Sequence, residues 1–374
     1  MKKTIISFVI LLFFNSSASA LDAPADRLFS NVTVLNDLQI EANFAEIFLN
    51  KNNPMRTQDV WHEGKIIVGA KTIATQIRLR GWSSQHICPF PKLMLKFKSK
   101  ETQGTIFEGI KKLDLSTHCY PDADQSEKQF FVEMKYAHRE SLIYEWLKIL
   151  GIPAYKTRPA KITYVDRSAT GALPTETHQA FFLQHLSEFK EEHLFGREIK
   201  PVNDRFRQQW ELKNPDKVGT DEAPLYLFES PEKHAQLDRG RLAEVCLFEM
   251  IIGNNDWRMN HQELWNVKLF QNQNQAWVTV PLDFNLSALA MGRPPYMTSP
   301  VHDEKKQWYD LATFDQKKAI IEKFQSKIPE LAASIEFLKA EDEVGYSSYQ
   351  QTLQEIPRFL NMLRTQIGLP EIKK

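Results

Sequence analysis

The sequence predicts an α+β protein with an N-terminal antiparallel sheet followed by a mainly helical region. Segments in which apolar and polar side chains alternate fill the first half of the chain, whereas residues 303–368 carry apolar residues at helical spacing. Between them, residues 239–252 form an almost wholly apolar stretch that fits a buried helix. Strands first and helices later is the order of α+β proteins, not of repeated βαβ units.

Three strands are predicted before residue 120. Residues 71–80 form the clearest one, and its faces alternate: Ile73, Thr75, Ile77 and Leu79 on one, Gln76, Arg78 and Arg80 on the other. Residues 93–97 alternate again, and residues 112–115 look like a third short strand. Gly81 to Ser84 is expected to turn the chain between the first two strands.

The remaining elements follow in chain order. A helix is expected over residues 133–150, ended by Gly151 and Pro153. Next come strands at 160–165 and 179–183 and an irregular or helical insertion at 187–236. They are followed by the helix at 239–252, a polar loop at 253–265, and strands at 267–270 and 276–280. The last two strands are close enough in sequence to pair as a hairpin.

The N-terminus has the three parts of a cleavable export signal. Lys2 and Lys3 precede an apolar run too short to span a bilayer, and the small residues Ala18 and Ala20 follow it. We therefore expect cleavage after Ala20 and a periplasmic or secreted mature chain, residues 21–374. No later stretch approaches the roughly 20 apolar residues of a spanning helix, so no integral membrane span is expected.

Charge and composition narrow the class of partner. The chain has 47 Lys and Arg against 47 Asp and Glu, a formal net charge of zero. Such a balance gives no electrostatic reason to expect nucleic acid or anionic lipid as a partner. With 42% hydrophobic residues, 11% of the chain being aromatic, the sequence can build a real core.

Three cysteines indicate one bridge and one core residue. Cys88 and Cys119 both border strand-like segments rich in turn residues, so a disulfide between them is predicted, in keeping with an oxidising compartment. Cys246 lies inside the apolar stretch 239–252 and is expected to be a buried thiol.

Three polar residues in the second half form the pattern with the most chemical content. The apolar helix leads into a loop with Asp256, Asn266 precedes one strand of the hairpin, and Asp283 follows the other. A loop acid that orients a hydroxyl, with an amide and an acid that hold a divalent cation on phosphate oxygens, is the set that phosphoryl transfer needs. The same residues also fit a structural interpretation in which Asp256 caps a turn, Asn266 starts a strand and Asp283 makes an Asx-turn.

The chain resembles the spore-coat protein H (CotH) kinase-like family of atypical protein kinases, most closely a branch of uncharacterised exported relatives. The resemblance runs from about residue 70 to 295, with gaps. It rests on these segments: Arg80 to Ser84 with Pro91-Lys92, the Arg139-Glu140 helix ending in Leu150-Gly-Ile-Pro153, Gly253 to Asp256 with Asn266-Val-Lys-Leu, Pro281 to Phe284, Cys88 to Pro91, and Thr117 to Cys119.

This resemblance implies a single kinase-like domain and a set of roles. The domain would span residues 21–374, with an N-lobe at about 40–185 and a C-lobe at about 186–374. The implied roles are Asp256 as the acidic residue of the catalytic loop, Asn266 and Asp283 as ligands of Mg²⁺ or Mn²⁺, and Arg80 with Lys92 or Lys96 at the phosphates of ATP. Lys96 also fits a solvated surface lysine, and Glu140 is either a lysine partner or a surface glutamate.

Departures from the family pattern leave two functions open. The loop from Asp256 to Asn266 is long, so Asn260 is a rival ligand, while Asn285 and Gln184 stand where relatives carry acids. One function is metal-dependent phosphoryl transfer from ATP to a protein acceptor. The other is a catalytically silent kinase-like domain that binds an envelope or secreted partner. A third, carbohydrate binding, is suggested only by the aromatic residues Trp82, Trp257 and Trp265.

Overall fold

The computed structural model describes residues 28–371, except 31, 50, 52–59, 120–136, 170, 172, 200–211, 214, 218–235 and 260–263. The expected export signal lies outside the described residues. So do the start of the helix expected at 133–150 and most of the insertion expected at 187–236.

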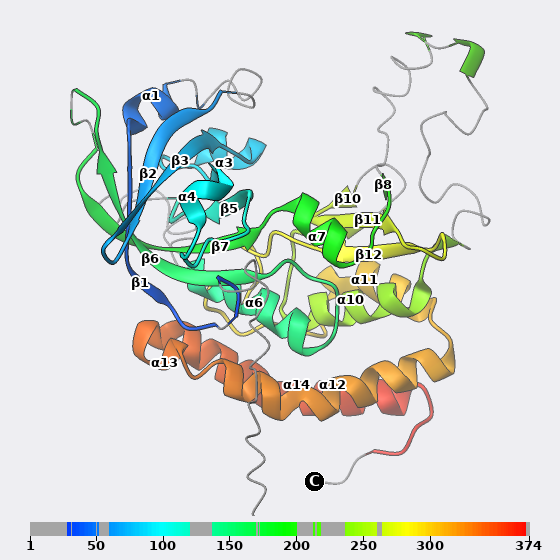
Figure 1. The fold of residues 1–374 in the computed structure, drawn as a ribbon. Coiled ribbons are helices and arrows are strands. Elements are labelled where there is room, and N and C mark those ends of the chain that lie inside the picture. The colour runs from blue at the N-terminus through cyan, green and yellow to red at the C-terminus, as the bar shows by residue number, and fades with distance from the viewer. Residues whose placement is uncertain are drawn as a thin grey trace, which may run out of the picture.

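Seven strands form one closed, barrel-like sheet (Figure 1). They are β1 (Leu35–Ala42), β2 (His62–Val68), β3 (Lys71–Leu79), β4 (Leu93–Phe97), β5 (Lys112–Ser116), β6 (Thr157–Asp166) and β7 (Glu176–Gln184). The strand order is β1-β2-β3-β4-β5-β7-β6, and β6 returns to β1. This corrects the expectation of an antiparallel N-terminal sheet, because β1 and β6 pair in parallel and close it.

Smaller strands follow the closed sheet. They are β8 (Glu198–Ile199), β9 (Arg258–Met259), β10 (Leu264–Trp265), β11 (Val267–Gln271) and β12 (Trp277–Pro281). The predicted hairpin is present: β11 pairs antiparallel with β12, and β8 pairs with the other edge of β11. Strands β9 and β10 form a separate antiparallel pair.

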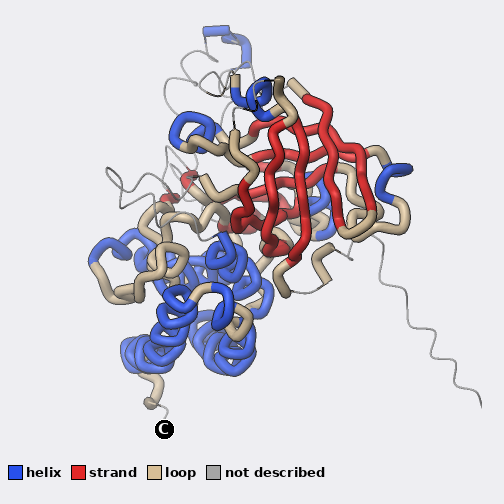
Figure 2. The backbone as a smooth tube through the Cα atoms, turned by 90° about the vertical axis from the view of Figure 1, so that its left-hand side faces the viewer, coloured by secondary structure: helices blue, strands red, loops and turns tan. Residues whose placement is uncertain are grey.

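Most of the long helices lie on the side of the molecule away from the closed sheet (Figure 2). The helices are α1 (Phe44–Phe48), α3 (Trp82–Ile87), α4 (Ser99–Thr102), α6 (Ala137–Ile149), α7 (Leu186–Glu192), η3 (Pro215–Lys217), α10 (Arg239–Ile251), η4 (Pro300–His302), α11 (Asp303–Asp310), α12 (Phe314–Ser334), α13 (Leu338–Glu341) and α14 (Glu343–Gln366). The predicted turn at Gly81 to Ser84 is instead the start of α3. None of the helices in the described ranges is long and apolar enough to cross a membrane.

Two hydrophobic cores divide the protein into a sheet lobe and a helical lobe. The first core is enclosed by the closed sheet and contains side chains such as Ile73 and Phe182. The second lies among the helices and the β11–β12 hairpin. Helix α6 falls within the range expected for the N-lobe, yet its apolar side chains belong to the helical core. Strand β7 joins the two, because Phe181 belongs to the helical core and Phe182 to the sheet core.

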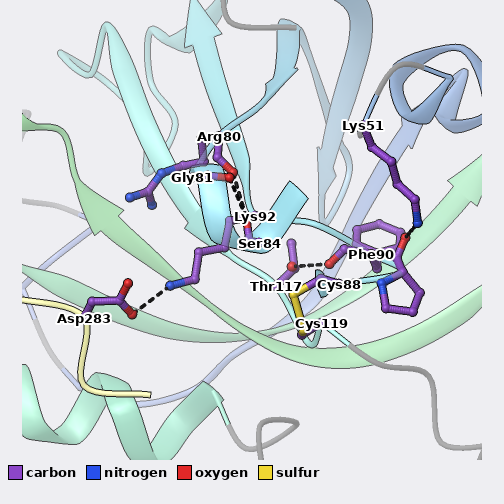
Figure 3. The surroundings of a disulfide bond; sticks show 11 residues. Lys51, Arg80, Gly81, Ser84, Cys88, Phe90, Lys92, Thr117, Cys119 and Asp283 are labelled. Carbon is purple, nitrogen blue, oxygen red and sulfur yellow. Dashed lines mark hydrogen bonds and ion pairs between the residues drawn. A yellow bond between two sulfur atoms is a disulfide. The ribbon is translucent and has the colours of Figure 1, made fainter. Parts of the chain in front are cut away.

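The predicted disulfide between Cys88 and Cys119 is present (Figure 3). Cys88 directly follows α3, and Cys119 lies just beyond β5. The neighbouring backbone is paired too: the N–H of Phe90 donates to the carbonyl of Cys119 at 3.0 Å, and the Thr117 hydroxyl donates to the carbonyl of Phe90 at 2.9 Å. Cys246 is a buried free cysteine, as expected. The bridge therefore anchors the segment between β3 and β4 to the end of β5.

Removing this disulfide is expected to lower the free energy of unfolding by roughly 3–4 kcal/mol, because the bridge closes a loop of 31 positions in the unfolded chain. The measurement is urea denaturation of the protein carrying Cys88→Ser and Cys119→Ser against the oxidised protein. The reduced protein is the control and should match the double variant. Equal stability of all three would contradict a stabilising role.

His118 lies beside the disulfide in a stack of aromatic rings. Its ring centroid is 3.7 Å from that of His178 and 4.7 Å from that of Phe90. Its Nδ1 is buried and has no hydrogen-bond partner among the described residues. Burial, reinforced by the charge of His178, lowers the pKa of His118 to about 3. The folded protein therefore holds this imidazole neutral.

The lowered pKa predicts that acid weakens the fold through His118. An unfolded histidine takes up a proton near pH 6.5, whereas the folded one does so only near pH 3, so the free energy of unfolding falls as the pH drops from 6.5. His118→Phe keeps a stacking ring and removes the proton site. We expect it to reduce the slope of stability against pH by about 1.4 kcal/mol per pH unit between pH 6 and 4, measured by urea denaturation. An unchanged slope in His118→Phe would contradict the prediction.

Candidate functional site

A cavity of about 360 Å³ lies where the sheet lobe meets α6 and the β11–β12 hairpin. Its walls carry charge of both signs from widely separated parts of the sequence. The charged side chains that line it are Arg78, Arg80, Lys92, Asp114, Glu140, Lys268 and Asp283. Because both lobes contribute, their relative placement determines the shape of the cavity.

The segment between β3 and β4 presents Arg80 and Lys92 to the cavity. The N–H of Arg80 donates to the carbonyl of Lys92 at 2.9 Å, which closes the loop that contains α3. The Ser84 hydroxyl donates to the carbonyl of Arg80 at 2.8 Å. Gly81 between them has φ of +74°, and a Cβ there would lie 2.9 Å from the Ser84 hydroxyl oxygen. Glycine is therefore required at this turn.

Helix α6 forms the opposite wall through Glu140 and Tyr144, one turn apart. The helix ends at Ile149, Gly151 just beyond it has φ of +63°, and the N–H of Ile152 donates to the carbonyl of Leu147. This is the glycine-dependent cap that the sequence predicted. Glu140 is buried, so the alternative that it is a surface glutamate is wrong.

The β11–β12 hairpin brings Asn266 and Asp283 to the same end of the hairpin. Val267 pairs with Pro281, and the N–H of Leu282 donates to the carbonyl of Asn266 at 3.0 Å. Asn266 and Asp283 are both left-handed, with φ of +54° and +56°. Such a backbone costs about 1–3 kcal/mol in a residue other than glycine and often marks a functional site.

Asp256 is placed by the end of helix α10. Gly253, two residues beyond the helix, has φ of +64°, and a Cβ there would meet Pro295 and Ala288 below 3.0 Å. The buried Asn254 then accepts the N–H of Asp256 at 3.0 Å. This tight packing holds the loop acid in one place.

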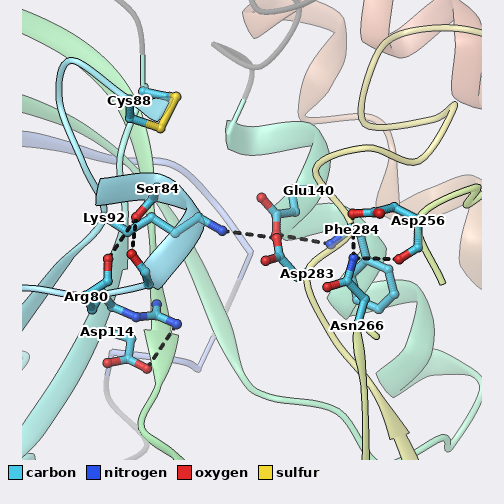
Figure 4. A network of polar contacts seen from close by, with 12 residues as sticks. Arg80, Ser84, Cys88, Lys92, Asp114, Glu140, Asp256, Asn266, Asp283 and Phe284 are labelled. Carbon is cyan, nitrogen blue, oxygen red and sulfur yellow. Dashed lines mark hydrogen bonds and ion pairs between the residues drawn. A yellow bond between two sulfur atoms is a disulfide. The ribbon is translucent and has the colours of Figure 1, made fainter. Parts of the chain in front are cut away.

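Asp256 and Asn266 form a direct pair (Figure 4). The Nδ2 of Asn266 donates to Oδ2 of Asp256 at 2.8 Å and to its carbonyl at 2.7 Å. The indole N–H of Trp265 donates to Oδ1 of Asp256 at 2.8 Å. Burial raises the pKa of Asp256, these two donors oppose the rise, and the charge of Asp283 adds to it. Asp256 is therefore oriented by two side-chain donors, one from Asn266 and one from Trp265.

Lys92, Asp283 and Glu140 form a charge cluster that bridges the two lobes (Figure 4). The Nζ of Lys92 donates to Oδ1 of Asp283 at 3.1 Å. Burial by itself lowers the pKa of Lys92, but the charges of Asp283 and Glu140 outweigh it and raise that pKa. Burial raises the pKa of Glu140 to about 7, against the opposing charge of Lys92. One ammonium thus faces two carboxylates.

The structure brings most of the predicted site residues together. Arg80, Lys92 and Asp283 line the cavity, and Asn266 and Asp256 lie next to Asp283 on the hairpin and its preceding loop. Lys96 does not line the cavity: it is exposed, with its ammonium 5.4 Å from the centroid of the Trp61 ring. The surface interpretation of Lys96 therefore fits its position.

The remaining candidates are placed or left open as follows. Asn260, the rival ligand, lies outside the described residues. Gln184 is buried and bonded within the chain, since it accepts the N–H of Lys156 and donates to Glu192. Trp257 is 2% exposed, so it is no surface aromatic; the side chain of Trp82 lies outside the described part of the chain.

The lining residues that sequence reasoning did not propose include Tyr144, Asp114 and Lys268. Asp114 pairs with Arg80 at 3.5 Å, and Lys268 with Glu198 at 2.5 Å. Lys268 belongs to the Asn266-Val-Lys-Leu segment, which was a usable signal. Tyr144 offered none, because an aromatic residue on an apolar helix is usually core.

Asn266 and Asp283 offer oxygen atoms that fit a divalent cation. The Nδ2 of Asn266 donates to Asp256, which leaves the side-chain oxygen Oδ1 of Asn266 for a cation. Asp283 accepts from Lys92 with one carboxylate oxygen, which leaves the other. Such oxygens are the ligands that Mg²⁺ prefers, usually completed by water and phosphate. Within the described ranges no group of three His, Cys, Asp or Glu side chains is arranged to hold a metal. The residues present thus fit a cation that binds together with phosphate rather than alone.

Comparisons with known proteins add a distant structural likeness. No protein-family model and no curated protein matches the chain. Among solved structures the chain is similar to the crystal structure of CtkA, a proinflammatory kinase of Helicobacter pylori, at 10% sequence identity. The match covers 75% of this chain and 96% of that chain, with a TM-score of 0.37. A likeness this distant carries no argument about function, which has to be inferred from the contacts within the site.

Lys92→Met is expected to lower the free energy of unfolding by about 2–4 kcal/mol, because Glu140 and Asp283 lose their counter-ion. The loss should be nearer the lower figure, since Asp283 is 38% exposed and water screens it. Urea denaturation near neutral pH measures it. Lys96→Met is the matched control, with an expected change below about 1 kcal/mol. Equal losses in the two variants would show that the cluster has no special role in stability.

Proposed function

We propose that this chain is an exported atypical kinase that transfers a phosphoryl group from ATP to a protein hydroxyl, with Mg²⁺ or Mn²⁺. The observation that carries the proposal is one continuous polar cluster, in which Lys92, Glu140 and Asp283 adjoin the Asn266–Asp256 pair. Phosphoryl transfer relies on positioning and charge rather than on covalent chemistry. The cluster supplies a lysine that can donate to phosphate oxygens, Lys92, and two oxygen ligands for a metal ion, from Asn266 and Asp283. It also supplies a carboxylate base, Asp256.

The nucleotide would lie in the cavity between the lobes. Lys92 would donate to its phosphate oxygens, with Arg80 beside it on the same wall. A divalent cation held by Asn266 and Asp283 would supply positive charge against the same oxygens. The charges of Asp283 and, less strongly, of Glu140 raise the pKa of Lys92 and so keep its ammonium protonated.

Asp256 would act on the acceptor. Its carboxylate takes the proton of the acceptor hydroxyl while that oxygen forms a bond to the γ-phosphorus. The bond from the γ-phosphorus to the β–γ bridging oxygen breaks, and ADP leaves with the electron pair. The raised pKa of Asp256 suits a group that accepts a proton.

The proposed site of action is the periplasm or the outside of the cell. The disulfide between Cys88 and Cys119 is of a kind that persists in oxidising compartments. The N-terminal pattern that ends at Ala20 supports the same placement. A kinase there needs ATP to be present at its destination, and its acceptor would be an envelope or secreted protein.

A silent binding domain is the second candidate, and one observation favours it. Both carboxylate oxygens of Asp256 already accept hydrogen bonds, from Asn266 and from Trp265. One of these two hydrogen bonds has to break before the carboxylate can accept the proton of an acceptor hydroxyl. In this case the cleft would bind a partner or a nucleotide without transfer.

Nucleotide binding and transfer can be measured separately. ATP with Mn²⁺ should stabilise the protein by about 2.7 kcal/mol at a hundredfold excess over Kd, read as a shift in thermal unfolding. In Asp283→Asn, the stabilisation by ATP should no longer increase when Mn²⁺ is added. Asp256→Asn should keep binding and lower transfer of labelled phosphate to the protein itself or to casein by about 10²- to 10⁴-fold.

The controls separate the two candidates. Lys96→Met should bind and transfer like the unaltered protein. Binding without transfer, in the unaltered protein as in Asp256→Asn, would favour the silent domain. Absence of any stabilisation by ATP would refute the kinase proposal.

A further inference from the structure

The turn at Asp283 and Phe284 is held by two side chains of α6. The N–H of Asp283 donates to the hydroxyl oxygen of Tyr144 at 3.1 Å, and the N–H of Phe284 donates to Oε1 of Glu140 at 3.3 Å. The Tyr144 ring packs edge-on against Phe284, with ring centroids 4.9 Å apart. These contacts hold Asp283 in its left-handed conformation, which would otherwise be unfavourable.

The Tyr144 hydroxyl has a hydrogen atom still to donate. Its oxygen accepts the N–H of Asp283, and no described residue accepts its own proton. The side chain is 3% exposed and lines the cavity. A buried donor left unpaired costs about 1–3 kcal/mol, so an acceptor in the cavity would stabilise it. Burial raises the pKa of Tyr144 well above 10, and the hydroxyl therefore keeps its proton.

The surroundings select the class of acceptor. The cavity is lined by four basic side chains, Arg78, Arg80, Lys92 and Lys268, and by three carboxylates, Asp114, Glu140 and Asp283. The lining therefore has a small excess of positive charge, which favours an anion. An oxygen that reaches Lys92 is also near Asp283, whose backbone Tyr144 already holds. A phosphate group offers several acceptor oxygens at once, and each can receive a different donor.

We propose that Tyr144 is a phosphate-binding residue, which donates its hydroxyl proton to a phosphate oxygen while it accepts the N–H of Asp283. This inference rests on the proposed nucleotide site. It assigns Tyr144 two contacts, one to the ligand and one to the backbone of a predicted metal ligand. Filling the cavity with phosphate thereby strengthens the positioning of Asp283.

Tyr144→Phe tests the proposal, because it removes the hydroxyl and keeps the ring against Phe284. The probes are ATP, inorganic tripolyphosphate and adenosine, each with Mn²⁺, titrated calorimetrically against the full exported protein. We expect affinity for ATP and tripolyphosphate to fall about tenfold to a hundredfold, the range for a hydrogen bond to a charged group. Affinity for adenosine should stay unchanged, whereas a merely structural defect would weaken all three.

Tyr164→Phe is the matched control. Tyr164 is also a buried tyrosine, but it lies in the sheet core. Removal of its hydroxyl should therefore change none of the three affinities. Unaltered ATP affinity in Tyr144→Phe, or an equal loss for adenosine, overturns the assignment of Tyr144 and leaves the nucleotide site standing. Failure of the unaltered protein to bind either ATP or tripolyphosphate overturns both.

Discussion

The ion pair between Lys92 and Asp283 is the interaction on which the cleft depends. The two residues are 191 positions apart, one just before β4 in the sheet lobe and the other just after β12 in the helical lobe. A partly buried charge without a partner is costly, so the pair selects one arrangement of the loop and the hairpin. Glu140 adds a second carboxylate to the same ammonium and ties α6 to this arrangement.

The β11–β12 hairpin places two predicted metal ligands at one of its ends, and both have an unfavourable backbone conformation. Asn266 and Asp283 are left-handed at adjacent positions across one end of the hairpin. Both are residues that tolerate this conformation better than most, since their short polar side chains bond locally. The bonds from Asn266 to Asp256 and from the Asp283 N–H to Tyr144 offset the strain. Strain that is held from several sides is typical of functional sites, whereas an ordinary hairpin end would use glycine.

Periodicity predicted the elements that obey it and missed those that break it. The strands β3, β4 and β12 and the helix α10 were found at nearly their observed bounds, because one side of each packs in a core. Strand β1 was missed because Asp37, with φ of +58°, lies where the register shifts between Leu35 and Leu38, which interrupts the alternation of apolar residues. In the site, alternation could place Lys96 on a strand face but not Lys92, which precedes the strand. Glu140 could not be assigned, because α6 is buried nearly all round and helical spacing then gives no exposed face.

Helix α6 is anchored to the helical lobe by buried contacts. Arg139 pairs with Asp342 at the start of α14, and Trp146 packs against Tyr349. The same helix presents Glu140 and Tyr144 to the cleft. A swing of α6 would break a buried ion pair, at a cost of about 3–5 kcal/mol. Separation of Lys92 from Asp283 therefore has to come from the sheet lobe, whose loop between β3 and β4 is held by a disulfide and not by the helical core.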